Sequence, residues 1–239
     1  MPPLPPQSKP VQPTVDLDRL WDFNDPAGTE LGFRALVFEA RAVGNLPYLA
    51  ILYTQIARAL GLQLRFPEAH VSLSEAEIIL NAPGNYSEAE MNVPRIRYLL
   101  ERGRVFNSTK QIDQAGPLFL AAFELATRTG EDHYAIDAAH MLGICLPAAA
   151  GAIWNERALE IAEKSADTRA RGWLGSIYNN LGWTVFGMND FPRALQLLEA
   201  GLKFRQERGQ ERETRIAKWG VYWPSTKPSA RATGLSSKN

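Results

Sequence analysis

The fold of this chain is decided by residues 179–201, which read NNLGWTVFGMNDFPRALQLLEAG. A Leu-Gly pair near the start of the stretch is followed by a short polar segment, an aromatic-Pro pair and an Ala-x-x-x-Leu spacing. Asp190 can cap a helix that begins with Phe191, and Pro192 then falls in the first turn, where a missing N–H is not needed. The stretch therefore predicts one helix, a turn around residues 187–190, and a second helix that packs back on the first.

The second helix of this stretch has two earlier counterparts, at residues 66–76 and 112–122. Aligned without a gap with residues 191–201, they share four columns that alternate large and small residues: Phe66, Ile112 and Phe191; Ala69, Ala115 and Ala194; Leu73, Phe119 and Leu198; Ala76, Ala122 and Gly201. Offsets of 0, 3, 7 and 10 residues place the columns on one helix face. Because small residues let a neighbouring helix approach closely, the pattern predicts repeated helix hairpins.

The rest of the sequence favours an all-α fold. Helical periodicity is widespread, whereas sustained alternation and hairpin-turn signals of β-strands are almost absent. Two further helices, expected to cap the first repeat over residues 15–46, are predicted from the apolar residues Leu17, Leu20 and Trp21, and then Leu31, Ala35 and Phe38. The proline-rich residues 1–14 and the Ser, Pro and Lys-rich residues 224–239 are expected to be disordered tails.

This pattern resembles the tetratricopeptide repeat family, in which an aromatic residue, Leu-Gly and an Ala-centred second helix recur over about 34 residues. The unit near the C-terminus matches most fully, through Tyr178, Leu181, Gly182, Val185, Phe191, Ala194 and Leu198, and an earlier unit repeats most of it through Gly103, Phe106, Ile112, Ala115, Phe119 and Ala122. The resemblance covers roughly residues 47–223. It implies a right-handed solenoid of antiparallel helix hairpins, with about four repeats in a domain of residues 15–223.

Each predicted first helix carries one stripe of residues that the core does not use. The three stripes are Arg97, Leu100, Glu101 and Arg104; Asp137, His140, Met141 and Ile144; and Ser176, Asn179, Asn180 and Trp183. Tetratricopeptide proteins hold extended peptides on this inner surface. The resemblance therefore implies a peptide-binding groove formed by Arg97, Glu101, Arg104, Asp137, His140, Asn179, Asn180 and Trp183.

Asn180 falls where peptide-binding members of the family often carry an asparagine that bonds the ligand backbone. An amide suits this role because it offers a donor and an acceptor together. The alternative is that Asn179 and Asn180 bond only locally or to water. The two-lysine and arginine arrangement that binds a terminal carboxylate in chaperone-binding members is not reproduced, since only Arg97 and Arg104 are candidates for it.

No catalytic, metal or cofactor site is expected. The histidines His70, His133 and His140 occur without a His-Glu-x-x-His motif or a cysteine partner, and no glycine-rich phosphate-binding loop is present. Ser176, the candidate nucleophile, lies in a helical pattern whose backbone N–H groups are already used, which argues against an oxyanion hole. We therefore expect a protein that is not an enzyme.

Charge and composition narrow the partners and the compartment. Lys and Arg total 26 and Asp and Glu total 26, so the chain has no net charge to attract nucleic acid or an anionic membrane. No apolar run approaches the roughly 20 residues that a membrane span requires. The single Cys145 is expected to be buried and inert, and the N-terminus lacks the apolar segment of a signal peptide. A cytoplasmic protein is expected.

The sequence thus favours a scaffold or adaptor that binds a protein or an extended peptide in the groove. The alternative is a self-association module that forms a homo-oligomer through the groove or through a partly exposed aromatic patch at Trp219, Tyr222 and Trp223.

Overall fold

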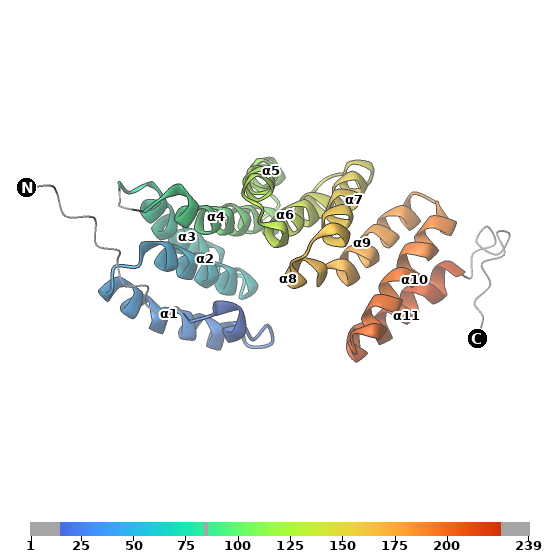
Figure 1. The fold of residues 1–239 in the computed structure, drawn as a ribbon, viewed down its shortest axis with the longest axis horizontal. Helices are drawn as coiled ribbons and strands as arrows, with labels where there is room; N and C mark the ends of the chain where they lie inside the picture. The colour runs from blue at the N-terminus through green and yellow to red at the C-terminus, as the bar shows by residue number, and fades with distance from the viewer. Residues whose placement is uncertain (1–14, 84–85, 226–239) are drawn as a thin grey trace, which may run out of the picture. The chain divides into compact units, whose positions relative to one another are not determined.

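The computed structural model describes residues 15–83 and 86–225, and within them every regular element is helical (Figure 1). The all-α prediction is confirmed. The elements are η1 (Leu17–Leu20), α1 (Pro26–Ala42), α2 (Leu46–Leu62), α3 (Phe66–Asn81), α4 (Glu88–Ser108), α5 (Ile112–Thr129), α6 (Asp132–Cys145), α7 (Ala148–Lys164), α8 (Thr168–Arg171), α9 (Leu174–Gly187), α10 (Phe191–Glu207) and α11 (Glu211–Ser225). The predicted tail at residues 1–14, and residues 226–239 of the other, lie outside the described residues.

Internal contacts divide the chain into two compact units, residues 1–94 and 95–239, with the boundary inside α4. Each unit is described by itself. A single continuous right-handed solenoid over residues 15–223 therefore stays a prediction.

In the first unit, α2 packs against both α1 and α3. It is the central helix of this unit, and Leu52, Ile56 and Leu60 on it are almost completely buried. The Asn45 side chain caps α2 by accepting a hydrogen bond from the backbone N–H of Tyr48 at 3.2 Å. The helix pair that the first repeat predicts is thus formed by α2 and α3.

The N-terminal cap packs through a different face from the one predicted. Its first helix is only the four-residue 3-10 helix η1. The second, α1, covers α2 through Phe33 and Ala40, which are 0% and 4% exposed, whereas Leu31 and Phe38 are 69% and 79% exposed. Apolar residues occur on two sides of α1, so periodicity alone offered two faces, and the prediction chose the wrong one.

The second unit contains the α6–α7 and α9–α10 hairpins, preceded by α5 and the C-terminal part of α4 (Figure 1). Helix α9 contacts both α7 and α10. Three of the four aligned columns are buried, as Ala115, Phe119, Ala122 and Ala194 at 0% and Leu198 at 2% exposure show in this unit, whereas Ile112 and Phe191 of the first column are only half-buried. These columns therefore form the inner faces of α5 and α10.

The glycines of the first helices have a packing role, both at Gly182 of the Leu-Gly pair and at Gly103, which follows Arg102. A Cβ atom at Gly182 would lie 2.7 Å from Leu198 Cγ, and one at Gly103 would lie 2.5 Å from Phe119 Cε1. Contacts this short do not occur between real carbon atoms, so any larger residue would push the two helices of the hairpin apart. Each glycine admits the large side chain of the partner helix.

The turn of the α9–α10 hairpin also agrees with the sequence prediction. Asn189 has a positive φ of 66°, a conformation that Asn tolerates better than most residues. Asp190 then caps α10, because its Oδ1 accepts a hydrogen bond from the backbone N–H of Arg193 at 3.2 Å.

After this hairpin, α11 packs against α10. Ala217 is 5% exposed, and a Cβ at Gly220 would lie 3.6 Å from both Leu198 Cδ2 and Trp183 Cζ2. The helix runs two residues beyond the predicted end at residue 223. Tyr222 is 61% exposed, as the aromatic patch requires. The side chains of Trp219 and Trp223 lie outside the described residues.

Candidate functional site

Three of the predicted groove residues of α4 and α6 meet in a buried ion cluster, here called the ionic junction (Glu101, Arg104 and Asp137). Arg104 Nη1 donates to Glu101 Oε1 at 2.9 Å, and Arg104 Nη2 donates to both carboxylate oxygens of Asp137, with Oδ2 at 2.6 Å. Glu101 is 5% and Asp137 8% exposed. The guanidinium group thus joins its own helix to the first helix of the next hairpin.

The electrostatics of this junction favour the internal ion pair over a ligand. Burial by itself lowers the pKa of Arg104, but the charges of Asp137 and Glu101 outweigh it and raise the pKa above its usual range. The Arg104 guanidinium already pairs with two carboxylates, so a ligand carboxylate would have to compete with both of them. A peptide terminus would also have to displace a buried carboxylate from the hydrogen bonds that it accepts from Arg104. This geometry argues against carboxylate binding by Arg104.

Arg97 and Leu100 also face inward. Arg97 Nε donates to the Tyr134 hydroxyl at 2.7 Å, and its guanidinium lies 5.3 Å from the centre of the Tyr134 ring. Leu100, which the sequence placed in the stripe, is 1% exposed and belongs to the core. The α4 part of the predicted groove is therefore occupied mainly with contacts to α6.

His140 links α6 to α9 in a second contact, here called the amide junction (His140, Asn155 and Asn180). Asn180 Nδ2 lies 3.3 Å from His140 Nδ1. Burial lowers the pKa of His140, and the charge of Arg104 lowers it further, against the opposing effects of Asp137 and Asn155. The imidazole is therefore neutral at pH 7. The neutral form whose Nδ1 carries no proton can accept a hydrogen bond from the Asn180 amide N–H group.

Asn155 on α7 is the buried member of the amide junction. It is 1% exposed, and its Nδ2 donates to the Gly151 carbonyl oxygen at 3.1 Å. His140 interacts with Asn155, yet Asn155 Oδ1 has no partner at normal hydrogen-bond geometry, so this contact is long or poorly aligned. A Cβ at Gly143 would collide with the Asn155 amide. Asn155 thus takes the place that a large apolar residue fills in the other hairpins.

The accessible part of the predicted groove lies on α9, at Asn179, Asn180 and Trp183. Together with Ser176 of the same stripe and Trp173, which immediately precedes the helix, these residues are here called the α9 surface. Trp183 is 39% exposed and packs edge-on against Phe186, with ring centres 5.5 Å apart. Asn179 and Asn180 are half-buried, and Asn179 Nδ2 donates to Asn180 Oδ1 at 3.3 Å. Asn179 Oδ1 has no hydrogen-bond partner among the described residues.

The sequence prediction omitted Trp173, although its signal was present. The spacing of the stripe extends one turn back from Ser176 to Trp173. The Trp173 ring lies between two histidines, 6.0 Å from His133 and 5.4 Å from His140 between ring centres. Its Nε1 donates to His133 Nδ1 at 3.2 Å. This ring extends the α9 surface toward α6.

Other chemistry is limited in the part of the chain that the structure describes. Within residues 15–83 and 86–225, no group of three His, Cys, Asp or Glu side chains could hold a metal ion. None of the helices in those residues combines the length and the apolar character that crossing a bilayer requires. Cys145 is half-buried rather than buried, and burial raises the pKa of its thiol, which lowers its reactivity at pH 7.

Comparisons with known proteins give information about the fold of this chain and none about the α9 surface. No family model matches the sequence, and no curated protein matches it. Among solved structures, the chain is similar to the crystal structure of BtubC (BKLC) from P. vanneervenii, with a TM-score of 0.58 over 95% of each chain. The two sequences are 14% identical. At that identity, what the two proteins share is an all-α fold.

Proposed function

We propose that the second unit is a non-enzymatic, tetratricopeptide-like module that binds an extended peptide on the α9 surface. The observation that carries the proposal is the half-exposed pair Asn179 and Asn180 beside the exposed ring of Trp183. Amides can pair with both the N–H and the C=O groups of a peptide backbone, and an exposed indole supplies apolar contact area. In this proposal the ionic junction positions α4 and α6 and does not contact the peptide.

The chemistry of the α9 surface favours a neutral stretch of peptide backbone over a charged terminus. Asn179 Oδ1 is available as an acceptor, and Asn180 is held in place by His140 and Asn179. A side chain fixed before binding loses little entropy when the ligand arrives. The same amide without such support would bind more weakly.

Selection of short random peptides displayed on phage against the full chain tests this proposal. Peptides that are recovered are synthesised, and their dissociation constants are measured by isothermal titration calorimetry. Asn179→Ala and Trp183→Ala should each weaken binding about tenfold, because truncating a central contact costs about 1–2 kcal/mol of binding free energy. Helicity measured by circular dichroism should not change.

Gln196→Ala is the matched control, since it removes an exposed side-chain amide from α10 in the same unit. Its affinity should equal that of the wild type. Peptides that bind Asn179→Ala, Trp183→Ala and Gln196→Ala equally well would place the binding site outside the α9 surface.

A second candidate function is self-association, which the exposed apolar face of α1 favours. Leu31 and Phe38 lie two turns apart on that face, and both are largely exposed. Large apolar side chains in this arrangement commonly mark an interaction surface. Light-scattering mass that rises with concentration in the wild type and not in Phe38→Glu would support self-association. A mass that stays at 26.6 kDa at all concentrations would exclude it.

A further inference from the structure

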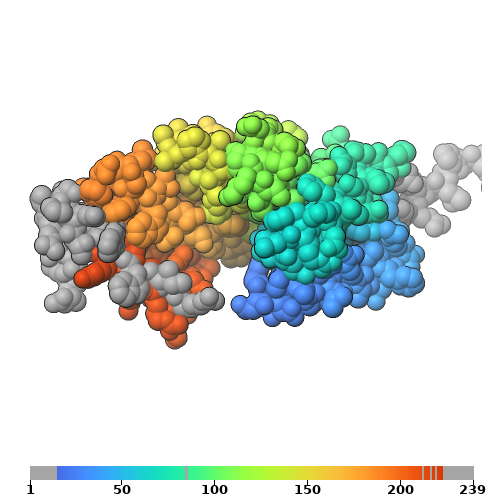
Figure 2. Space-filling view, turned by 180° about the vertical axis from the view of Figure 1, so that it is seen from behind, coloured from blue at the N-terminus to red at the C-terminus, as the bar shows by residue number. Residues whose placement is uncertain are grey.

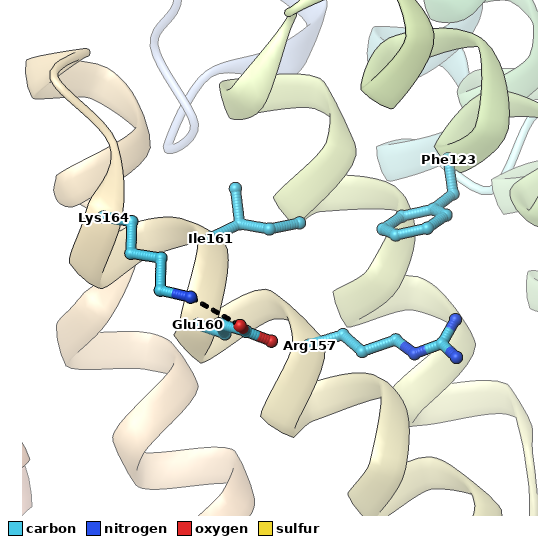
Figure 3. A pocket seen from close by; sticks show the side chains of 5 residues that line it. All are labelled: Phe123, Arg157, Glu160, Ile161 and Lys164. Carbon is cyan, nitrogen blue, oxygen red and sulfur yellow. Dashed lines mark hydrogen bonds and ion pairs between the residues drawn. The ribbon is translucent and has the colours of Figure 1, made fainter.

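A pocket lies between α5 and α7 of the second unit, on the second helices of their hairpins, and the described residues that line it include none of the α9 surface. Its volume is about 350 Å³, and its lining is Phe123, Arg157, Glu160, Ile161 and Lys164. Figure 2 shows the surfaces of α5 (light green) and α7 (yellow) side by side. In Figure 3, Phe123, Ile161 and Arg157 extend toward the same space.

The apolar part of this pocket is supported from behind by aromatic packing. Phe123 and Ile161 pack against the buried cluster that joins α6, α7 and α9. Phe123 also meets Trp154 edge-on, with ring centres 5.1 Å apart. These side chains are fixed by their neighbours, so the pocket keeps its shape without a ligand.

Arg157 gives the pocket a positive charge that no carboxylate of the described residues neutralises by an ion pair. Its guanidinium lies 4.7 Å from the centre of the Trp154 ring, a stacked position that leaves its N–H groups available. The nearby acids are already paired: Glu156 with Arg193, and Glu160 with Lys164 at 2.6 Å. The lining residues Arg157, Glu160 and Lys164 together carry a formal charge of about +1.

We propose that this pocket binds one aromatic side chain of an acidic peptide, with the ring against Phe123 and Ile161 and a neighbouring carboxylate on Arg157. The volume is at the lower end of the roughly 300–1,000 Å³ typical of ligand sites, which suits a single large side chain. Among the described residues, the walls come from two helices, so the pocket holds an anchoring group without surrounding a whole ligand. Charge complementarity selects an acidic partner, and bidentate pairing with carboxylate is the interaction that arginine geometry favours.

Isothermal titration calorimetry with defined, unlabelled peptides tests the proposal on the full chain. The probe is acetyl-Gly-Glu-Glu-Phe-Glu-Gly-amide, with two counterparts in which Ala replaces Phe or Gln replaces every Glu. The parent peptide should bind, and each counterpart should bind about tenfold more weakly. Equal binding of all three peptides, or no binding of the parent at millimolar concentration, overturns the proposal.

Two variants of this chain give opposite expectations. Arg157→Glu reverses the unpaired charge and should weaken the parent peptide about tenfold or more. Glu160→Gln removes the anion from the rim and frees Lys164, so it should strengthen binding about twofold to threefold. Glu160 and Lys164 are 64% and 75% exposed, so their pair contributes little to folding.

Arg208→Glu is the matched control, because Arg208 also stacks on a ring, 4.9 Å from the centre of Phe204 on α10. It should bind the parent peptide as the wild type does. An equal loss in Arg157→Glu and Arg208→Glu would mean that only the overall charge matters, which overturns the proposal. A larger loss of peptide affinity in Asn179→Ala than in Arg157→Glu would also overturn it. If 3-phenylpropanoate bound as tightly as the peptide, the ligand would be a small carboxylate, and the proposal would again be overturned.

Discussion

The ionic junction and the amide junction join successive first helices of the second unit by different chemistry. At the ionic junction one guanidinium is enclosed by two carboxylates that are 5% and 8% exposed. At the amide junction a neutral imidazole meets the Asn180 amide at 3.3 Å, and both of these side chains are half-buried, although the third member, Asn155, is 1% exposed. One row of residues in the sequence thus contains an internal structural contact and an accessible surface.

The difference shows what decides whether a polar residue of such a stripe can bind a ligand. A charge that is buried away from water costs free energy unless an opposite charge pairs with it. The members of the ionic junction therefore stay paired with one another rather than with a ligand. Neutral amides can exchange a local bond for a ligand bond at little cost, because water or peptide satisfies them equally well. The amide junction can therefore contribute to recognition while the ionic junction fixes the helices.

The largest effect is expected for Arg104→Ala, which removes the ion pairs that the buried Glu101 and Asp137 make with this guanidinium. The free energy of unfolding should fall by about 3 kcal/mol, at the lower end of the range for a broken buried ion pair because Arg104 is 17% exposed. Urea unfolding followed by circular dichroism measures this loss. Adding Asp137→Asn and Glu101→Gln should recover part of it, since two buried negative charges that had paired with Arg104 are then removed.

Arg193→Ala provides the control for that prediction. The pair of Arg193 with Glu156 is 49% and 42% exposed, so its loss should cost less than about 1 kcal/mol. If Arg104→Ala cost no more than Arg193→Ala, the ionic junction would not be a committed contact, and the difference between the two junctions would disappear.

A substitution inside the α9–α10 hairpin should lower the free energy of unfolding by an amount between those expected for the two junctions. Gly182→Ala should lower the free energy of unfolding by about 1–3 kcal/mol, because the added Cβ would lie 2.7 Å from Leu198 Cγ. Gly187→Ala, in the same helix, has no neighbouring atom within 4 Å of its added Cβ and should be neutral or stabilising by up to about 1 kcal/mol. Thermal unfolding of both variants checks this; equal melting temperatures would refute the close packing at Gly182.

The hairpin interiors were predictable from sequence because their packing is local and repeated. Gly182 and Leu198 are 16 residues apart in one hairpin, and the same pairing recurs for Gly103 and Phe119. The α6–α7 hairpin was not predictable in this way, since Asn155 replaces the large apolar residue and fills the space with an amide. A pattern of large and small residues does not anticipate a polar side chain in that place.

The candidate site was predictable in position and not in role. Spacing placed Arg104, Asp137, His140 and Asn180 on one row, and the structure brings them into contact. The pairing among these residues depends on their rotamers and on the offset between helices. Neither can be predicted from the spacing along one helix. The unexpected outward face of α1 has the same cause, because it depends on which side α2 approaches.

A smaller effect is expected for Asn180→Ala, which tests the amide junction directly. The variant loses one hydrogen bond between neutral groups that water can replace, so the free energy of unfolding should fall by about 0.5–1.5 kcal/mol. The exposed Gln196→Ala should have no measurable effect on urea unfolding. A loss for Asn180→Ala as large as that of Arg104→Ala would show that both junctions are equally committed.

The smallest expected effect is a pH dependence that His140 introduces. Burial lowers its pKa in the folded protein below the roughly 6.5 of an unfolded chain, so between these two values the unfolded state binds more protons. Stability should therefore fall as the pH decreases through this window and level off once both states are protonated. Protonation also removes the acceptor that Asn180 requires at Nδ1, which acts in the same direction. Urea unfolding of the wild type and of His140→Gln from about pH 8 to pH 5 measures the difference between their free energies of unfolding. The contributions of His70 and His133 are common to both proteins and cancel in this difference. The wild type should lose more stability than the variant, and parallel curves would mean that the folded protein does not keep His140 neutral.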